Sequence, residues 1–299
     1  MRTALDTLTN ELRRLKAAGV GSVSVSDEGM ASLRAAVRRF ASVARATEAP
    51  APAQKTTQPV LSRVEAAAKP SVAAKLPPAP VWVPPPGDKT FRWNVLHEFV
   101  SNDPVCRAHV RPGRKVVLGV GNLDAGIFFV GEAPGAEEEI QGEPFVGPAG
   151  QLLTKMIGAM GLSRSEVYIG NIMNWRPELP VGPEGVQFGN RPPSEEEMAY
   201  CMPYLRAQIE IVNPGLIVAL GATAAQALLG FGTFKALGEV RGKWREFAGK
   251  PLMVTYHPSY ILRNQSNRSK RLIWDDLLKV MERAGLPVSD KQRGFFANG

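Results

Sequence analysis

Short apolar runs alternate with longer amphipathic patterns through the second half of the chain. The runs lie at 127–130, 167–169, 216–220 and 252–255. Each is too short for a helix and is apolar at consecutive positions, which is typical of strands buried on both faces. Between the runs, apolar residues recur at helical spacing, as they do from Leu152 to Ile157. We therefore expect a three-layer α/β/α domain around a central, mainly parallel four-stranded sheet.

The chain before this domain has a different composition. Ten of the 25 prolines lie between residues 50 and 86, interleaved with alanine, and this predicts a flexible Pro/Ala-rich linker at 48–88. Leucines at helical spacing among charged residues predict an N-terminal helical extension at 1–47. The extension could dock a protein partner, although so short a segment is more typical of an appendage. The domain is expected at 91–286, with a C-terminal tail at 287–299.

Composition excludes several classes of protein. The two cysteines, Cys106 and Cys201, are too few for a disulfide framework or a paired zinc motif. The first 15 residues carry charges throughout, and the most apolar stretch, 216–229, is shorter than a bilayer span. We expect a cytoplasmic protein that does not insert into a membrane.

The net charge of +8 is concentrated near one end of the chain. Residues 235–299 contain 13 Lys and Arg against 6 Asp and Glu. A basic surface of this kind attracts polyanions such as nucleic acids. On charge alone, a solvated surface that serves solubility is an equally good explanation.

A polar or glycine-containing motif follows each predicted strand. Glu132 follows the first strand, Asn171 the second and His257 the fourth. Because the carboxyl ends of parallel strands open on one crevice, we expect these three residues to be neighbours. Phe145, in a glycine-flanked loop, could provide a stacking surface for a flat ring. Each residue alone has an ordinary structural explanation, and it is their convergence that favours a binding site.

A nucleotide-phosphate site is a weaker alternative for the glycine-rich turn after the first strand. The segment Gly131–Gly135 does not match G-x-G-x-x-G, and the chain contains no G-x-x-x-x-G-K-[ST]. Three consecutive glutamates, 137–139, would also repel a pyrophosphate.

These motifs resemble those of the family 4 type of uracil-DNA glycosylase, within the uracil-DNA glycosylase superfamily. The matching segments are Val130–Gly135 with the acidic triplet after it, Gly142–Leu153, Gly189–Pro193, Thr255–Arg263 and Lys270–Trp274. The resemblance covers roughly residues 100–285. It implies hydrolysis of the N-glycosidic bond of deoxyuridine in DNA, which starts base excision repair and requires the nucleotide to be flipped into a pocket.

The resemblance also implies roles for individual residues. Phe145 would stack on the flipped uracil, Asn171 would read its hydrogen-bonding edge, and His257 would donate a hydrogen bond to the ring oxygen that gains charge. Gly131, Glu132 and Ala133 would shape the substrate and water loop, with Glu138 as a second candidate near the water. The predicted catalytic residues are therefore Glu132, Asn171 and His257.

DNA contacts are expected from the loop after the last strand, which would press against the minor groove. The predicted DNA-binding residues are Ser259, Tyr260, Arg263, Lys270 and Arg271.

Ala133 stands where a related family has an aspartate that orients water, so no side chain at that position can accept a proton. The water must be held either by the backbone or by Glu132, and the sequence leaves both open.

A [4Fe-4S] cluster held by four cysteines is a property of the family that this chain matches only in part. Cys106 and Cys201 occupy the second and fourth ligand positions, whereas Asp103 and Trp175 occupy the first and third. An indole has no lone pair to offer a metal, so we expect no cluster, no other cofactor and no metal site.

Three functions stay open at this stage. The first is a cluster-free uracil-DNA glycosylase, acting as a monomer on single- or double-stranded DNA and associated with the nucleoid through that DNA. The second is a DNA-binding adaptor for repair or replication with weak or no activity. The third is a glycosylase for another deaminated base.

Overall fold

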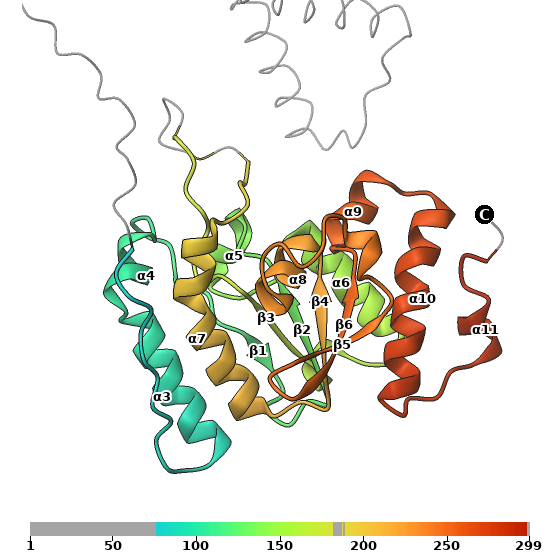
Figure 1. Cartoon of the computed structure of the whole chain (residues 1–299), viewed down its shortest axis with the longest axis horizontal. Helices are drawn as coiled ribbons and strands as arrows, with labels where there is room; N and C mark the ends of the chain where they lie inside the picture. The colour runs from blue at the N-terminus through green and yellow to red at the C-terminus, as the bar shows by residue number, and fades with distance from the viewer. Residues whose placement is uncertain (1–75, 182–186, 188, 298–299) are drawn as a thin grey trace, which may run out of the picture. The chain divides into compact units, whose positions relative to one another are not determined.

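The apolar runs form the central strands of a mixed sheet. A computed structural model describes residues 76–181, 187 and 189–297 (Figure 1). The parallel strands are β2 (Ile127–Gly131), β3 (Tyr168–Asn171), β4 (Leu216–Leu220) and β6 (Lys250–Thr255). The sheet order is β1-β3-β2-β4-β6-β5, in which β1 (Val120–Gly121) and β5 (Trp244–Phe247) pair antiparallel at the two edges. The predicted parallel core is confirmed, and the two short edge strands extend it.

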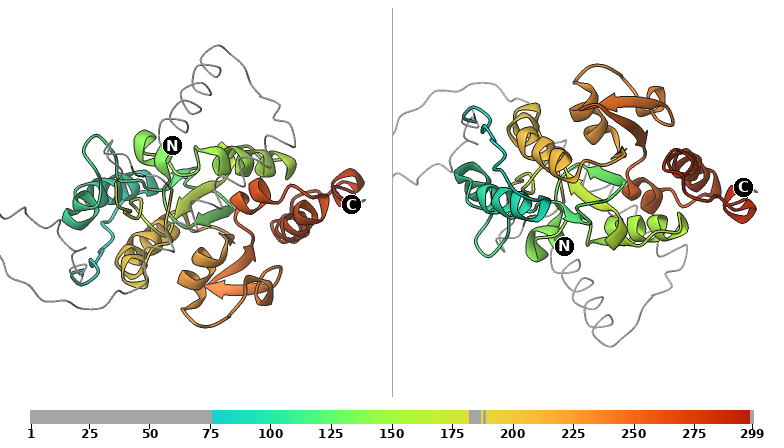
Figure 2. Two further views of the ribbon diagram at one scale, coloured as in Figure 1. Left: turned by 90° about the horizontal axis from the view of Figure 1, so that it is seen from above. Right: turned by 90° about the horizontal axis from the view of Figure 1, so that it is seen from below.

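Helices cover both faces of this sheet. In chain order they are α3 (Lys89–Ser101), α4 (Pro104–Ala108), α5 (Ala136–Gln141), α6 (Pro148–Ala159), α7 (Glu195–Val212), α8 (Ala222–Leu229), α9 (Pro258–Arg263), α10 (Asn267–Arg283) and α11 (Asp290–Arg293). Seen along the strands, helices lie on either side of the sheet (Figure 2). The three-layer α/β/α architecture is therefore confirmed.

Two apolar clusters, one on each face, hold these layers together. In β2, Phe128 and Val130 pack into a core with α3, α7 and α8, whereas Ile127 and Phe129 pack into a core with α6 and α10. Alternate residues of a strand point to opposite faces, so an uninterrupted apolar run is what a sheet covered on both sides requires. All five residues of β2 and of β4 are buried.

The packed region continues beyond both ends of the predicted 91–286 domain. Leu76 and Trp82 pack against the core before α3 begins. At the other end, Nε1 of Trp274 donates to the carbonyl oxygen of Gln292 at 2.6 Å, and the Phe295 ring lies 5.2 Å from the Trp274 ring. The predicted extension at 1–47 and the linker up to residue 75 lie outside the described residues. Among the helices that the structure describes, none has the length and apolar character needed to cross a bilayer.

Candidate active site

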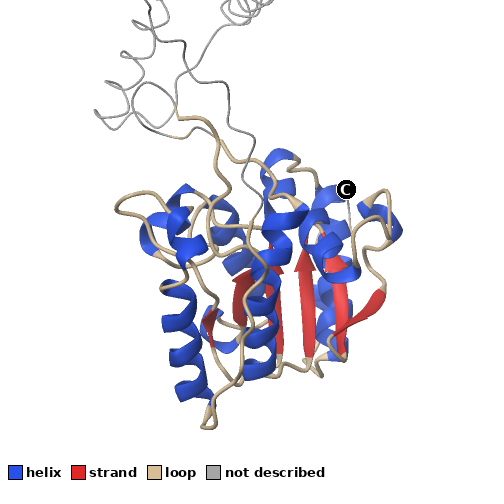
Figure 3. Ribbon diagram, turned by 60° about the vertical axis from the view of Figure 1, so that its left-hand side comes forward, coloured by secondary structure: helices blue, strands red, loops and turns tan. Residues whose placement is uncertain are grey.

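A pocket of about 650 Å³ lies at the carboxyl ends of the parallel strands. The strand arrows in Figure 3 point to the end of the sheet where it opens. Seven of the predicted site residues line it: Glu132, Ala133, Phe145, Asn171, His257, Ser259 and Arg263. The topology thus brings together residues that are more than 120 positions apart in the sequence.

Gly131, the last residue of β2, forms the floor beneath two of these side chains. A methyl group added at Gly131 would overlap both the ring of Phe145 and the amide oxygen of Asn171. Only a residue without a side chain lets the aromatic ring and the amide approach the strand this closely.

Phe145 is held in a conformation that a non-glycine residue rarely adopts. Its φ is +56°, in the left-handed region, and its side chain is 6% exposed. Its ring centroid lies 5.6 Å from that of His257, at 31° between the planes. Left-handed backbone at such a residue costs about 1 kcal/mol or more and is found where surrounding contacts enforce it. The structure contains such contacts in the loop around Phe145.

Glu138 provides the contacts that enforce this loop. Its carboxylate accepts hydrogen bonds from the backbone N–H groups of Gly135 at 3.1 Å, Val146 at 3.0 Å and Gly147 at 2.9 Å. It therefore joins the turn after β2 to the loop that carries Phe145. Because these N–H groups use three of the roughly four acceptor sites of the carboxylate, Glu138 positions the loops.

Asn171 presents an unsatisfied hydrogen-bond acceptor in the pocket. The residue ends β3 and is 6% exposed, and its Oδ1 is buried with no hydrogen-bond partner among the described residues. A buried polar atom left unpaired costs roughly 1–3 kcal/mol. A bound molecule with an N–H group facing this oxygen would recover that cost.

His257 is a neutral hydrogen-bond donor. It caps the amino end of α9, and its Nδ1 accepts from the backbone N–H of Ser259 at 3.2 Å and lies 2.9 Å from the Ser259 hydroxyl. Since Nδ1 accepts, the single proton of the neutral ring is on Nε2. Burial, with a further contribution from the charge of Arg263, lowers the pKa of His257 to about 4. At neutral pH the ring can donate through Nε2 without carrying a charge.

Glu137 lines this pocket without a side-chain hydrogen bond or ion pair to the described residues, and Glu132 is a second such carboxylate. Its side chain lines the pocket and makes no hydrogen bond or ion pair with the described residues, although its backbone carbonyl accepts from the N–H of Met173 at 3.1 Å. The contrast with Glu138 separates the two acidic residues by what they contact. The Glu138 carboxylate holds the backbone of two loops, and the Glu132 carboxylate faces the pocket.

The predicted DNA-binding residues divide into two groups. Ser259 and Arg263 of α9 line the pocket, whereas Tyr260 stacks on Tyr256 with ring centroids 4.4 Å apart and does not line it. Lys270 and Arg271 also lie outside the pocket. Nζ of Lys270 is 5.8 Å from the centroid of the Phe296 ring.

Arg271 is committed to contacts within the protein. Its guanidinium pairs with Asp275 at 2.8 Å and donates to the carbonyl oxygens of Arg293 and Phe295 at 2.7 and 2.8 Å. Arg271 therefore fastens the C-terminal segment to α10.

The segment before α7 forms one wall of the pocket, and its residues were not predicted from the sequence to lie there. Asn190, Arg191 and Pro192 line the pocket, and the Arg191 guanidinium makes a bidentate ion pair with Glu197 at 2.7 and 2.6 Å. Two features of the sequence could have indicated this segment. They are the motif at 189–193 and the capping box of Ser194 and Glu197 that follows it at the start of α7.

The four positions related to cluster ligands do not fit an iron–sulfur cluster. Cys106 and Cys201 are fully buried, and a hydrogen bond with Cys201, together with burial, raises the pKa of the Cys106 thiol. Asp103 accepts from the hydroxyls of Tyr200 at 2.9 Å and Tyr204 at 2.8 Å. Its carboxylate is thus occupied by neutral donors.

The third ligand position is filled by an indole. Trp175 is 1% exposed, and its ring stacks on His109 with centroids 5.0 Å apart and 11° between the planes. An indole cannot ligate iron, and two thiols fall short of the four ligands that a [4Fe-4S] cluster takes. No step of a reaction is assigned to such a cluster.

Comparison with known proteins places this site in a family. Residues 118–278, more than half of the chain, match the family model described as the uracil DNA glycosylase superfamily. A type-4 uracil-DNA glycosylase of Thermotoga maritima is 43% identical over 187 residues, which cover 62% of this chain and 91% of that protein. The type-4 enzymes of Pyrobaculum aerophilum and Archaeoglobus fulgidus are 40% and 41% identical, with 58% and 56% of this chain and 87% and 82% of those proteins covered. This chain is a member of the uracil-DNA glycosylase superfamily.

Proposed function

We propose that the protein is a DNA glycosylase that hydrolyses the N-glycosidic bond of deoxyuridine in DNA. The observation that carries the proposal is the combination of a neutral donor, His257, with an unpaired acceptor, Asn171, beside the ring of Phe145. The type-4 relatives carry the name uracil-DNA glycosylase. The product is an abasic site in DNA, from which base excision repair proceeds.

The pocket residues match the hydrogen-bonding groups of uracil. Uracil presents an N–H at N3 between two carbonyl oxygens, so Oδ1 of Asn171 can accept from N3–H while its Nδ2 donates to O4. Nε2–H of His257 is then the donor for O2. The ring of Phe145 supplies the stacking surface. Since the base must enter this pocket, the nucleotide has to leave the helical stack.

Bond cleavage places a negative charge on the leaving uracil. The electron pair of the C1′–N1 bond goes to the base, and the charge spreads onto O2. The hydrogen bond that Nε2–H of His257 donates to O2 then becomes stronger than it is in the ground state. A water oxygen then bonds to C1′ and loses a proton. Donors that strengthen their bonds only as charge develops lower the barrier, typically by about 3–4 kcal/mol for one donor.

We assign the attacking water to the Glu132 carboxylate. Ala133 has no group that can accept a proton, and Glu138 is held by three backbone N–H groups. Glu132 and Glu137 both line the pocket without a competing contact among the described residues. Glu132 is preferred because it directly follows Gly131, the strand residue beneath Phe145 and Asn171. Water bound by the backbone is the alternative, and Glu132→Gln distinguishes the two, since loss of a general base lowers the rate roughly 10²–10⁴-fold.

We also propose that the enzyme acts without an iron–sulfur cluster. The Asp103 carboxylate and the buried Trp175 ring support this, because they occupy two of the four ligand positions with groups engaged elsewhere. Iron and acid-labile sulfide are measured in protein purified without oxygen. Stoichiometric amounts of both would overturn the proposal.

The activity is tested with end-labelled oligonucleotides that carry one lesion. The full chain is incubated with deoxyuridine in single strands, opposite guanine and opposite adenine, and then with hypoxanthine and xanthine, before alkaline cleavage. We expect cleavage at deoxyuridine, and loss of at least about 100-fold in rate for Asn171→Ala and for His257→Ala. His109→Ala, outside the pocket, is the control for removal of an imidazole.

Each other outcome favours a different function. Cleavage at hypoxanthine but not at deoxyuridine would change the substrate and keep the chemistry. Binding without cleavage of any strand would identify a DNA-binding protein that has the fold without the activity.

A further inference from the structure

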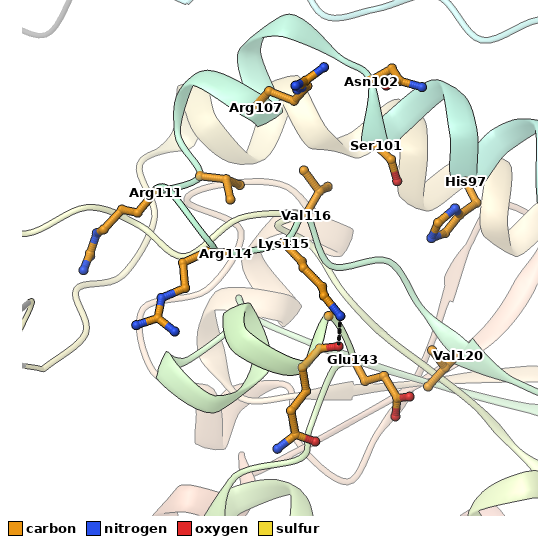
Figure 4. Close-up of a pocket in the computed structure, with 13 residues that line it drawn as sticks. His97, Ser101, Asn102, Arg107, Arg111, Arg114, Lys115, Val116, Val120 and Glu143 are labelled. Atoms are coloured by element: carbon orange, nitrogen blue, oxygen red, sulfur yellow. Dashed lines mark hydrogen bonds between the residues drawn. The ribbon is translucent and has the colours of Figure 1, made fainter.

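A second pocket, of about 790 Å³, lies apart from the proposed active site. It is formed by the end of α3, by α4 with the segment that follows it, and by the end of α5. The side chains drawn in Figure 4 come from these elements, from Glu143 just after α5 and from Val120 of β1. Its ionisable lining residues are His97, Arg107, Arg111, Arg114, Lys115 and Glu143. We call it the basic pocket.

The basic pocket carries a local excess of positive charge. Four of its cations fall within nine residues, 107–115, and the sequence contains no Asp or Glu between Asp103 and Asp124. Against these four cations, Glu143 is the one carboxylate that lines the pocket within the described part of the chain. In Figure 4, Lys115 and Glu143 lie in the middle, and Arg111 and Arg114 extend along one side.

The protein neutralises little of this charge. The Arg107 guanidinium makes no hydrogen bond or ion pair with the residues that the structure describes, and the Arg107 backbone N–H donates to the carbonyl oxygen of Asp103. Nε of Arg114 lies 3.8 Å from Glu139, which is paired more closely, at 3.0 Å, with Arg176. Nζ of Lys115 donates to a backbone carbonyl, that of Gln141, at 3.2 Å. These cations are therefore available to an anionic ligand.

Helix α5 connects the basic pocket to the proposed active site. Gly135, Glu137 and Glu138, at its start, line the active-site pocket, and Gln141, at its end, lines the basic pocket. Six helical residues span about 9 Å. Helices α4, α5 and α9 also lie at the same end of the sheet in Figure 1. A DNA strand held at the active site would reach the basic pocket within a few nucleotides.

We propose that the basic pocket binds backbone phosphates of the substrate DNA, on one side of the flipped nucleotide. This inference rests on the proposed function and adds a second contact region to it. With phosphates about 3.4 Å apart along the axis of a duplex, the contacted phosphates lie roughly three to five nucleotides from the lesion. Such contacts add affinity and fix the register of the protein on DNA, and they carry no sequence preference.

The test removes two charges while keeping side-chain size. The variant Arg107→Gln with Arg114→Gln is compared with Lys235→Gln and Arg245→Gln. Both control residues are exposed cations, and Arg245 lies in β5, at the sheet edge opposite β1. Binding to a duplex with a non-cleavable abasic analogue is measured from about 50 to 200 mM salt. Thermal unfolding shows that both variants are folded.

Loss of two phosphate contacts lowers the slope of log affinity against log salt by about 2. Wild-type affinity would then fall about tenfold more than that of the variant across this salt range. The control variant should keep the wild-type slope. Single-turnover excision at saturating enzyme should be unchanged in both variants, since neither pair touches the proposed active site.

A second measurement locates the contact along the DNA. The lesion is placed about two nucleotides from one end of the duplex and then from the other. The difference between wild type and variant should disappear for one short flank and persist for the other. A difference that persists with both short flanks would show that the pocket does not contact flanking phosphates.

Failure of this inference differs from failure of the proposed function. If wild type excises uracil but the arginine variant keeps the wild-type salt slope, the basic pocket does not bind DNA. If no lesion is excised yet the slope falls as stated, the pocket binds DNA and the assigned chemistry is wrong.

Discussion

Lowering the pH tests the assignment of His257 as a neutral donor. A histidine with an unperturbed pKa near 6.5 gains its charge between pH 7.5 and pH 5.5. The pKa of His257 is lowered to about 4, first by burial and then by the charge of Arg263. Its ring should stay neutral over the whole interval, with Nδ1 accepting from the Ser259 N–H and Nε2 donating.

At pH 5.5, the fraction of His257 that is neutral differs more than tenfold between a pKa of about 4 and a pKa of 6.5. With a pKa of about 4, roughly 3% of the ring is protonated at pH 5.5, whereas a pKa of 6.5 gives about 91%. If the neutral ring is the active form, the rate should be nearly flat from pH 7.5 to 5.5. An ordinary pKa would instead reduce the rate about tenfold over this interval, and a mechanism that needs the charged ring would make the rate rise.

The assay is single-turnover excision of deoxyuridine at saturating enzyme, in buffers of constant ionic strength. His257→Gln, which cannot titrate, should give a slower but equally flat profile. A wild-type rate that rises or falls severalfold with an apparent pKa near 6.5, while the variant stays flat, would refute the assignment.

Folding stability supplies an independent measure of the same shift. The unfolded chain binds a proton at His257 near pH 6.5 and the folded chain only near pH 4, so the contribution of this residue to stability is lost as the pH falls between these values. Each unit of pKa difference corresponds to about 1.4 kcal/mol, giving at most about 3 kcal/mol in all. Urea unfolding of wild type and His257→Gln should diverge over this range.

Four further changes test the roles assigned to single residues. Glu138→Gln should lower the single-turnover rate about tenfold with little effect on DNA affinity, because it weakens the hydrogen bonds that position the Phe145 loop. Gly131→Ala should reduce excision at least about 100-fold, since its methyl group overlaps the stacking ring, and should also destabilise the fold by about 1–3 kcal/mol, seen in thermal unfolding. Glu132→Gln should slow a chemical step by about 10² or more, and a rate within threefold of wild type would favour water held by the backbone. Asp103→Ala should lower the free energy of unfolding in urea by about 2–4 kcal/mol, because two buried hydroxyls and an N–H lose their acceptor; a loss below about 0.5 kcal/mol would contradict this.

Hydrophobic pattern was enough to predict the core strands, because a strand buried on both faces must be apolar along its whole length. The edge strands β1 and β5 were not predicted, because neither has a long apolar run. The two residues of β1 are too few to show a period, and in β5 Arg245 and Glu246 are exposed. Strand β1 pairs with β3 and β5 pairs with β6. The residues of the two edge strands alone do not indicate these pairings.

The candidate site was predictable wherever topology alone brings residues together. Glu132, Asn171 and His257 each follow a parallel strand, so their convergence needed no knowledge of side-chain packing. The role of Glu138 could not be foreseen, because it depends on how a loop eight to nine residues later folds back onto the carboxylate. Tyr260 turned to stack on Tyr256, which a strand-end argument cannot detect.

Charge counting along the sequence pointed to residues 235–299 and did not single out the cations at 107–115. Of the cations in residues 235–299, Arg241 pairs with Asp276, Arg271 with Asp275 and Arg293 with Glu282. A net charge summed over a segment does not show which cations fold against carboxylates. The cations at 107–115 have a smaller total, but they lie around one pocket, and Arg114 is the one among them with a carboxylate partner in the described part of the chain.

Asp103, at one of the positions related to the cluster ligands, connects α4 to α7. The Asp103 carboxylate caps α4 by accepting from the Cys106 N–H at 2.7 Å, and it accepts from two tyrosine hydroxyls of α7. Burial opposes ionisation of Asp103, but these hydrogen bonds outweigh it and keep its pKa below the usual value. The connection between α4 and α7 is therefore fully made at neutral pH and lost as the pH falls through that lowered pKa.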